Sequence, residues 1–187
     1  MTQALRFVTA RDLFEAYPIA LDELYVEATD QPSLEFLRSL VDSNALGKAI
    51  GFCAYLLPRR QAVWWAAHCI RMMVATRTAD EDAGLQVAEA WLKEPEEDRR
   101  LASLEFGQRA DQRLPTTWVA LAAGWAGPTM PAGEDKPLTV PPYQTARAAR
   151  AAVLIAGSRV PAKQRDEMLR RCVESGAKLA VGENPTV

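Results

Sequence analysis

Apolar residues recur every three or four positions along most of the chain, which is the spacing of one face of an α-helix. A short amphipathic helix is expected over 10–17, where Thr9 offers an N-terminal cap and Pro18 ends the element. Residues 19–29 fit a helix only in part, because flanking prolines leave little room. The longer expected helices run over 32–41, 42–57, 58–75, 78–92, 95–113, 114–125, 146–156 and 161–175. The pattern predicts an all-α fold of about eight helices, arranged as a compact bundle or a short helical array.

The helix expected over 58–75 is apolar nearly all round. It contains the adjacent Trp64 and Trp65, and its central part has only His68 and Arg71 as strongly polar side chains. A helix without a polar face is typical of a buried position. Because neighbouring helical residues point about 100° apart, the two tryptophans cannot both face the same neighbour. One of them is therefore available to line a groove or a partner surface.

Two further helices are expected between residues 95 and 125. In the first, the apolar side chains of Leu101, Ala102, Leu104 and Phe106 are expected to face inward. The second, over 114–125, repeats the order of a Leu-Pro pair, polar residues, and then Trp with small apolar residues that opens the helix over 58–75. This weak repeat is the reason for considering a helical array beside a bundle.

The segment 127–142 differs from the rest of the chain in composition. It holds five of the twelve prolines and two glycines, and it shows no helical spacing. Such a composition is typical of an irregular connection. We therefore predict a main helical bundle over 1–126, a Pro/Gly-rich linker over 127–142 and a C-terminal helix pair over 143–187. Thr145 and Gly157 are expected to bound the first helix of that pair, and Gly176 to end the second.

Composition is that of a soluble globular protein. The chain has 187 residues, 49% of them hydrophobic, which is enough to build a core without metals or disulfides. The three cysteines are an odd number and lie far apart, so a disulfide framework is not expected. The N-terminus lacks the pattern of a signal peptide, and no apolar stretch is long enough to span a bilayer. We expect a cytoplasmic protein without membrane contact.

Few residues offer chemistry. With His68 as its single histidine, the chain has no candidate for a serine-type triad or a multi-histidine metal centre. A metal site of Cys53, His68 and Cys69 is conceivable if the helices pair, but metal-ligand spacings are absent. The acidic runs over 80–82 and 96–98 each lie in a helix first turn, where the helix dipole favours carboxylates. No catalytic residue, cofactor or metal is therefore expected.

Net charge gives no drive toward nucleic acid, although charge is uneven. The formal charge is −2, with eight Lys and Arg against four Asp and Glu over 143–187. The basic side chains that could form one face are Arg147, Arg150, Arg159, Lys163, Arg165, Arg170 and Arg171. Tyr143 is the single aromatic beside them, so a nucleic-acid role of these C-terminal arginines is kept as a second alternative.

The order of these pieces resembles an uncharacterised family of small all-helical bacterial proteins, a domain of unknown function. The stretches that carry the resemblance are 52–65, 88–91, 118–122 and 137–142, followed by the alanine-rich helix pair. Its most specific part is the Pro-Arg-Arg-x-Ala-Val-Trp-Trp core. The resemblance implies that some relatives are encoded near genes of type VI secretion, the contractile phage-tail-like apparatus. It implies no activity and no catalytic residues.

These observations favour a non-catalytic role in which the protein binds another protein. An adaptor, chaperone or assembly accessory of a bacterial secretion locus fits best, and a homodimer is a further expectation. The partner surface is predicted at Arg59, Arg60 and the more exposed of Trp64 and Trp65, with 127–142 as a second docking segment. The first alternative is an enzyme or a protein that binds a metal or small ligand in a pocket near His68, Cys69 and Arg71.

Overall fold

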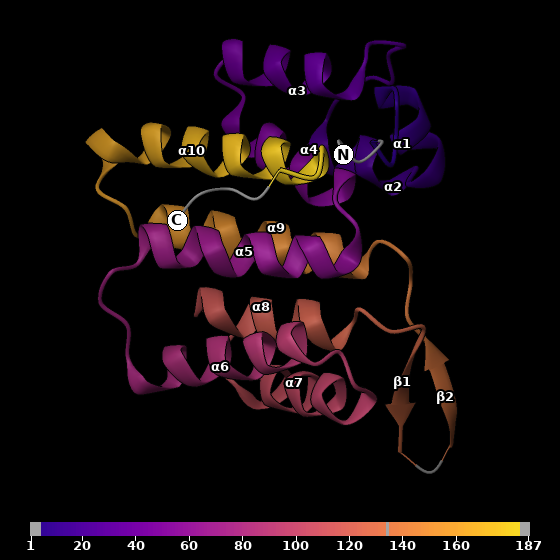
Figure 1. Cartoon of the computed structure of the whole chain (residues 1–187), viewed down its shortest axis with the longest axis vertical. Helices are drawn as coiled ribbons and strands as arrows, with labels where there is room; N and C mark the ends of the chain where they lie inside the picture. Colours follow the sequence, from indigo (N-terminus) through magenta and orange to yellow (C-terminus); the bar gives the residue numbers. More distant parts are fainter. Residues whose placement is uncertain (1–4, 134, 184–187) are drawn as a thin grey trace. The chain divides into compact units, whose positions relative to one another are not determined.

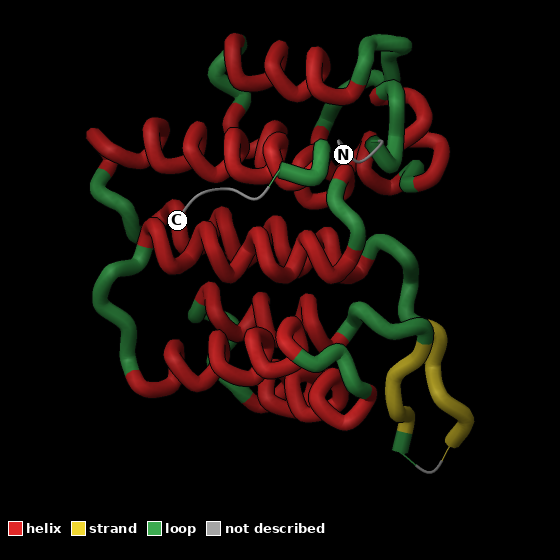
Figure 2. The backbone as a smooth tube through the Cα atoms, in the orientation of Figure 1, coloured by secondary structure: helices red, strands yellow, loops and turns green. Residues whose placement is uncertain are grey.

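The computed structural model describes residues 5–133 and 135–183. Within these residues the chain forms ten helices, nine of them with seven or more residues, and one β-hairpin (Figures 1 and 2). The fold is therefore mostly helical, as the spacing of apolar residues predicts. The expectation of an all-α fold is wrong in one place, the hairpin.

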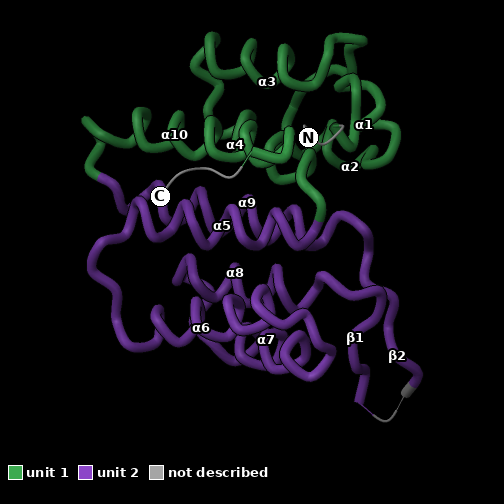
Figure 3. Tube along the Cα trace, viewed as in Figure 1, with its two compact units in different colours: residues 1–58, 161–187 green, residues 59–160 purple. Residues whose placement is uncertain are grey.

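The chain divides into two compact units, coloured separately in Figure 3. Unit 1 consists of Met1–Pro58 and Pro161–Val187, and unit 2 consists of Arg59–Val160. A proline marks each crossing between the units, which fits the tendency of proline to interrupt helices. The division into 1–126, 127–142 and 143–187 stays a prediction, because compact units need not coincide with domains.

Unit 1 contains five helices, one of which is central. They are α1 (Ala10–Ala16), α2 (Ile19–Leu24), α3 (Ser33–Asp42), α4 (Leu46–Leu56) and α10 (Ala162–Ala180). Helices α2, α3 and α10 all pack against α4. Its core includes the rings of Phe14, Phe36 and Phe52, whose centroids lie 4.9 to 5.9 Å apart. The cap expected at Thr9 is confirmed, since its hydroxyl accepts the backbone N–H of Asp12.

Unit 2 is built around α8. Its elements are α5 (Arg59–Met73), α6 (Ala79–Lys93), α7 (Glu97–Arg109), α8 (Pro115–Gly124), β1 (Thr129–Ala132), β2 (Asp135–Thr139) and α9 (Gln144–Ser158). In Figure 1, α8 lies between a layer formed by α5 and α9 and a layer formed by α6 and α7, and it packs against all four. Nine of its ten residues are buried. Alanine, glycine and threonine side chains allow this close approach on every side.

The hairpin replaces part of the irregular linker expected over 127–142. Strands β1 and β2 pair antiparallel, with Thr129 opposite Thr139 and Met130 opposite Leu138. The turn contains Gly133 at φ +64°, a conformation that favours glycine. Prolines suit edge strands because their fixed φ is compatible with extended backbone, and a two-stranded hairpin has only edges. The many prolines and glycines of this segment therefore indicate a turn, but they do not predict that the residues before and after it pair as strands.

Helix α10 continues four residues past the glycine expected to end it, whereas α9 ends at Ser158, one residue after its glycine. Gly157 and Gly176, expected to end them, both lie within helices and are buried. Thr145 is likewise inside α9, whose N-terminal cap position is held by Tyr143. Glycine costs about 1 kcal/mol in a helix interior relative to alanine. Past Gly176, α10 continues with the buried Leu179 and Ala180, and their burial offsets that cost.

No helix in the described part of the chain is both long enough and apolar enough to cross a membrane. The longest, α10, has 19 residues but carries charged side chains along its length. The most uniformly apolar, α8, has ten residues, which at 1.5 Å per residue span about 15 Å of a bilayer core that is about 30 Å thick.

Candidate functional site

The predicted partner residues Arg59 and Arg60 bind backbone carbonyls within unit 2, after the end of α8 and in the last turn of α6. One guanidinium nitrogen of Arg59 donates hydrogen bonds to the carbonyl oxygens of Ala126 and Gly127, at 3.0 and 3.1 Å. Arg60 donates to the carbonyl oxygen of Leu92, near the end of α6. Carbonyls at helix C-termini lack partners in their own helix and carry partial negative charge. Both arginines therefore have a structural task at the start of α5.

The two adjacent tryptophans differ in exposure. Trp65 is completely buried, whereas Trp64 is half-buried and stacks on His68, with ring centroids 5.0 Å apart and planes 10° apart. Of this pair, Trp64 is thus the one that fits the predicted partner surface. The assignment of Arg59, Arg60 and Trp64 to such a surface stays a prediction.

The residues considered for chemistry near His68 are spread over the molecule. Cys69 is buried in α5, and Arg71 forms two hydrogen bonds with Glu89 of α6, at 2.7 and 2.8 Å. Cys53 belongs to unit 1, and burial raises the pKa of its thiol, which disfavours the thiolate that a metal would need. Among residues 5–133 and 135–183, no group of three His, Cys, Asp or Glu side chains is placed to hold a metal ion.

The C-terminal arginines considered for a basic face are divided between the two units. Those up to Arg159 belong to unit 2 and the later ones to unit 1. Arg159 forms an ion pair with Glu81, and Arg170 donates to the carbonyl of Val41 and to Oδ1 of Asn44. Arg159 and Arg170 thus hold neighbouring segments together.

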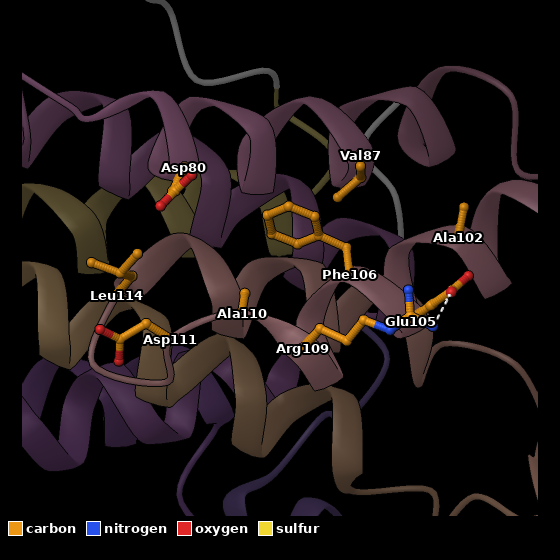
Figure 4. Close-up of a pocket in the computed structure, with 9 residues that line it drawn as sticks. All are labelled: Asp80, Val87, Ala102, Glu105, Phe106, Arg109, Ala110, Asp111 and Leu114. Carbon is orange, nitrogen blue, oxygen red and sulfur yellow. Dashed lines mark ion pairs between the residues drawn. The ribbon is translucent and has the colours of Figure 1, made fainter.

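A groove of about 600 Å³ lies within unit 2, between α6 and α7 (Figure 4). Its lining comes from these two helices and from the loop that follows α7. The lining residues are Asp80, Val87, Ala102, Glu105, Phe106, Arg109, Ala110, Asp111 and Leu114. Of the geometry described so far, this is the feature that a partner could occupy, and we take it as the candidate functional site.

The floor of the groove is apolar, with the Phe106 ring at its centre (Figure 4). Val87, Phe106 and Leu114 are half-buried, and Ala102 is exposed. The expectation that Ala102 and Phe106 face inward is therefore wrong, whereas Leu104 is buried as expected. The reason is that α7 has two faces, a buried one that includes Leu104 and Gly107 and another, at a spacing of three and four residues, that places Ala102 and Phe106 in the groove.

Helix α7 is fixed on α8 by contacts that admit no side chain at two glycines. A Cβ added at Gly107 would lie 2.6 Å from the Leu121 side chain, and one added at Gly124 would lie 2.6 Å from the Leu104 Cα. Such distances mean that the helices approach each other at the level of their backbones. The wall of the groove that α7 provides is therefore rigidly positioned.

The loop at one end of the groove is also held in place. Thr117 of α8 donates its hydroxyl hydrogen bond to the carbonyl of Asp111, at 2.7 Å, and the Trp118 indole N–H donates to the carbonyl of Gln112, at 2.8 Å. The Arg113 guanidinium hydrogen-bonds Asp111 and lowers the pKa of that carboxyl. These bonds fix the backbone that carries Leu114 into the groove.

Charges lie at the rim. Arg109 pairs with Glu105 one turn earlier on α7, at 2.7 Å, so these two neutralise each other. Asp111 is compensated by Arg113. Asp80, in the first turn of α6, has no ion-pair partner within the part of the chain that the structure describes. The groove thus carries one uncompensated negative charge, beside Leu114.

The other two carboxylates of the 80–82 run have separate tasks. Glu81 is completely buried, accepts the backbone N–H of Thr78 in a capping box, and pairs with Arg159. Burial by itself raises the pKa of the Glu81 carboxyl, but the hydrogen bonds from Arg159 and Thr78 outweigh it, and the pKa is lowered. Asp82 pairs with Arg77 at 2.7 Å. The favourable interaction with the helix dipole is common to all three carboxylates. It does not distinguish Asp80, which lines the groove, from Glu81 and Asp82.

The groove was not expected from the sequence, although one signal for it exists. On α7, residues 102, 105, 106 and 109 follow helical spacing, and so do the buried residues 100, 103, 104 and 107. Two stripes on one helix indicate two packing surfaces. Which stripe meets α8 and which stays open depends on the glycine contacts, and these are visible only in the fold.

Comparison with known proteins places the chain in a family. The model described as "Family of unknown function (DUF6931)" matches residues 36–180, a range that includes the whole of unit 2 and hence the groove. Comparison with curated proteins finds no match, and neither does comparison with solved structures. Because the family model matches well over half of its length, the chain belongs to the DUF6931 family.

Proposed function

We propose that the protein acts without catalysis, by binding another protein in the groove between α6 and α7. An adaptor, chaperone or assembly accessory works in this way. The observation that carries the proposal is the open apolar floor around Phe106, held between two helices that are fixed on α8. Contiguous exposed apolar surface with a polar rim is typical of interaction sites.

The lining supports binding rather than catalysis. It contains no serine, cysteine, histidine or lysine, so a nucleophile would have to be one of three carboxylates. Glu105 and Asp111 are each paired with an arginine, at 2.7 Å, so an oxygen of each carboxylate is already engaged. No base oriented by a third group is present in the lining.

The shape favours a protein over a small molecule. Sites for small ligands usually enclose most of the ligand surface. Here every lining residue is half-buried or exposed, so the groove is open along its length. A ligand lying in it would keep one face in water, as a segment of a larger partner does.

The resemblance to proteins encoded near type VI secretion genes supplies the class of candidate partners, namely other products of such a locus. The predicted surface at Arg59, Arg60 and Trp64 remains a second proposal for unit 2. A pocket near His68 and a nucleic-acid face at the C-terminal arginines are less well supported, because Arg71, Arg159 and Arg170 have structural partners.

Affinity capture from the native host tests the proposal with three forms of the full-length protein. Ala102→Arg fills the exposed edge of the groove without touching the core, and Gln108→Arg adds the same charge to an exposed position of α7 outside the groove. Both substitutions suit a helix. We expect the wild type and Gln108→Arg to retain the same stoichiometric protein and Ala102→Arg to lose it. Equal capture by all three forms would refute the proposal.

A further inference from the structure

The groove has features that define what kind of segment it takes. Resting on the function proposed above, we infer that the occupant is one amphipathic helix of the partner, which lays an apolar stripe over Phe106 and places a Lys or Arg beside Asp80. The inference rests on three observations: the length of the groove, the absence of backbone partners along its walls, and the position of its uncompensated charge.

The length matches about two helical turns. On α7 the lining runs from Ala102 to Arg109, seven steps of 1.5 Å, or about 10 Å. On α6 it runs from Asp80 to Val87, about 10 Å. An occupant helix covers this distance with apolar side chains at positions i, i+4 and i+7, which is the usual arrangement of helix-in-groove recognition.

The walls favour a helix over an extended strand. An extended peptide gains affinity when its N–H and C=O groups pair with an exposed strand edge. Both walls of this groove are helices, whose backbone groups are already paired along α6 and α7. Over the apolar floor at Val87 and Phe106, an extended backbone would lose water without gaining partners, which is costly. A helix satisfies its own backbone and avoids this cost.

The uncompensated charge of Asp80 determines the direction in which the occupant helix lies in the groove. Figure 4 shows Asp80, Asp111 and Leu114 at one end of the groove and the Glu105–Arg109 pair toward the other. Asp80 is exposed and unpaired, so a cation on the occupant can reach it without displacing an existing partner. Pairs of this kind contribute modestly to affinity but select the orientation and the register of the bound helix.

Selection from a display library tests the inference on the full-length protein. The probe is a library of 20-residue peptides built on a helix-forming scaffold, selected on the wild type and counter-selected on Ala102→Arg. We expect the surviving peptides to carry apolar residues at i, i+4 and i+7 and a Lys or Arg at one end of that stripe. Survivors without helical apolar spacing, survivors without a basic bias, or no survivor that distinguishes the two proteins would each overturn the inference.

A charge-exchange experiment then tests whether Asp80 contacts the basic residue of the bound peptide. For a selected peptide we expect Asp80→Asn to weaken binding about two- to fivefold, the range of an exposed ion pair, and the matched Asp98→Asn in the first turn of α7 to leave it unchanged. A peptide whose basic residue is replaced by Glu should bind Asp80→Lys better than it binds the wild type. Equal effects of the two Asn variants, or no recovery in the exchanged pair, would contradict the role of Asp80. Melting temperatures of the variants verify that each is folded.

The two proposals fail differently. If capture from the host depends on the groove but the captured segment is extended or lacks a basic residue, the inference on the helix is wrong and the proposed function stands. If no host protein is captured in a groove-dependent way, the proposed function is wrong, whatever peptides the library yields.

Discussion

At the scale of single residues, adjacent acidic side chains differ in their burial and in their partners. Asp80, Glu81 and Asp82 follow one another at the start of α6, yet the first is exposed in the groove, the second is buried and the third pairs with Arg77. The difference arises from helix geometry, since each residue points about 100° from the last. Sequence alone assigns all three to the helix dipole, because the partners Arg77 and Arg159 are identified only by tertiary structure.

The buried Glu81 carboxylate makes stability depend on pH. Its pKa lies below the ordinary 4.5, so it stabilises the fold above that pH and ceases to do so as the pH falls through its native pKa. We expect Glu81→Gln to lower the free energy of unfolding at pH 7 by about 2 kcal/mol, because it removes the charged partner of Arg159. The loss is not larger because Arg159 is partly exposed and solvent screens the ion pair. Urea unfolding at several pH values measures this.

The same titration contains its own control. The difference between the wild type and Glu81→Gln should shrink as the pH is lowered from 5 toward 3, whereas Asp82→Asn, at a half-exposed surface pair, should change stability by less than about 1 kcal/mol throughout. A Glu81→Gln deficit that is constant over this range would show that the carboxylate is not charged in the fold.

At the scale of elements, local signals and packing contribute unequally to what can be predicted. The cap at Thr9 and the proline at the start of α8 place helix starts correctly, because these signals depend on residues that are close in sequence. The end of α9 is predicted to within one residue by Gly157, but the end of α10 is not predicted by Gly176, because this glycine is buried inside the helix. The hairpin depends on strand pairing across a turn, which the helical spacing of apolar residues does not predict.

Close packing of α7 on α8 is testable at Gly124. We expect Gly124→Ala to destabilise the protein by about 1–3 kcal/mol, since the new Cβ would meet the Leu104 backbone at 2.6 Å and the helices would have to separate. Gly47→Ala is the matched control in α4, where nothing lies within 4 Å, and it should be neutral or stabilising by up to about 1 kcal/mol. Thermal and urea unfolding compare the two, and equal effects would argue against the tight α7–α8 contact.

The hairpin is anchored to α7 by a buried arginine. Arg100 is 3% exposed, donates to the carbonyls of Gly124 and Thr129, and pairs with Glu97. We expect Arg100→Met to cost about 3 kcal/mol and to speed amide hydrogen exchange over 129–139, because three polar groups lose their partner. Arg99→Met removes only an exposed pair with Glu94 and should leave exchange in the hairpin unchanged. Similar exchange in both variants would show that the hairpin is held by other contacts.

At the scale of the whole molecule, the sequence leads to a mostly helical protein of an uncharacterised family but to a different candidate surface. Arg59, Arg60 and Trp64 attract attention because charge and aromatic side chains stand at a helix start. Whether such arginines face a partner or a helix C-terminus depends on the position of α6 and α8, which are distant in sequence. The groove is invisible for the same reason, since it exists only where α6 and α7 are both fixed on α8.

Site-specific photo-crosslinking in the native host tests the central claim most directly. The photoreactive amino acid p-benzoylphenylalanine replaces Ala102 at the edge of the groove in one variant and Gln108, an exposed residue of α7 outside the groove lining, in another. A groove that binds a protein predicts a discrete adduct with one host protein at position 102 and no such adduct at position 108. No adduct at position 102, or the same adducts at both positions, would contradict the account.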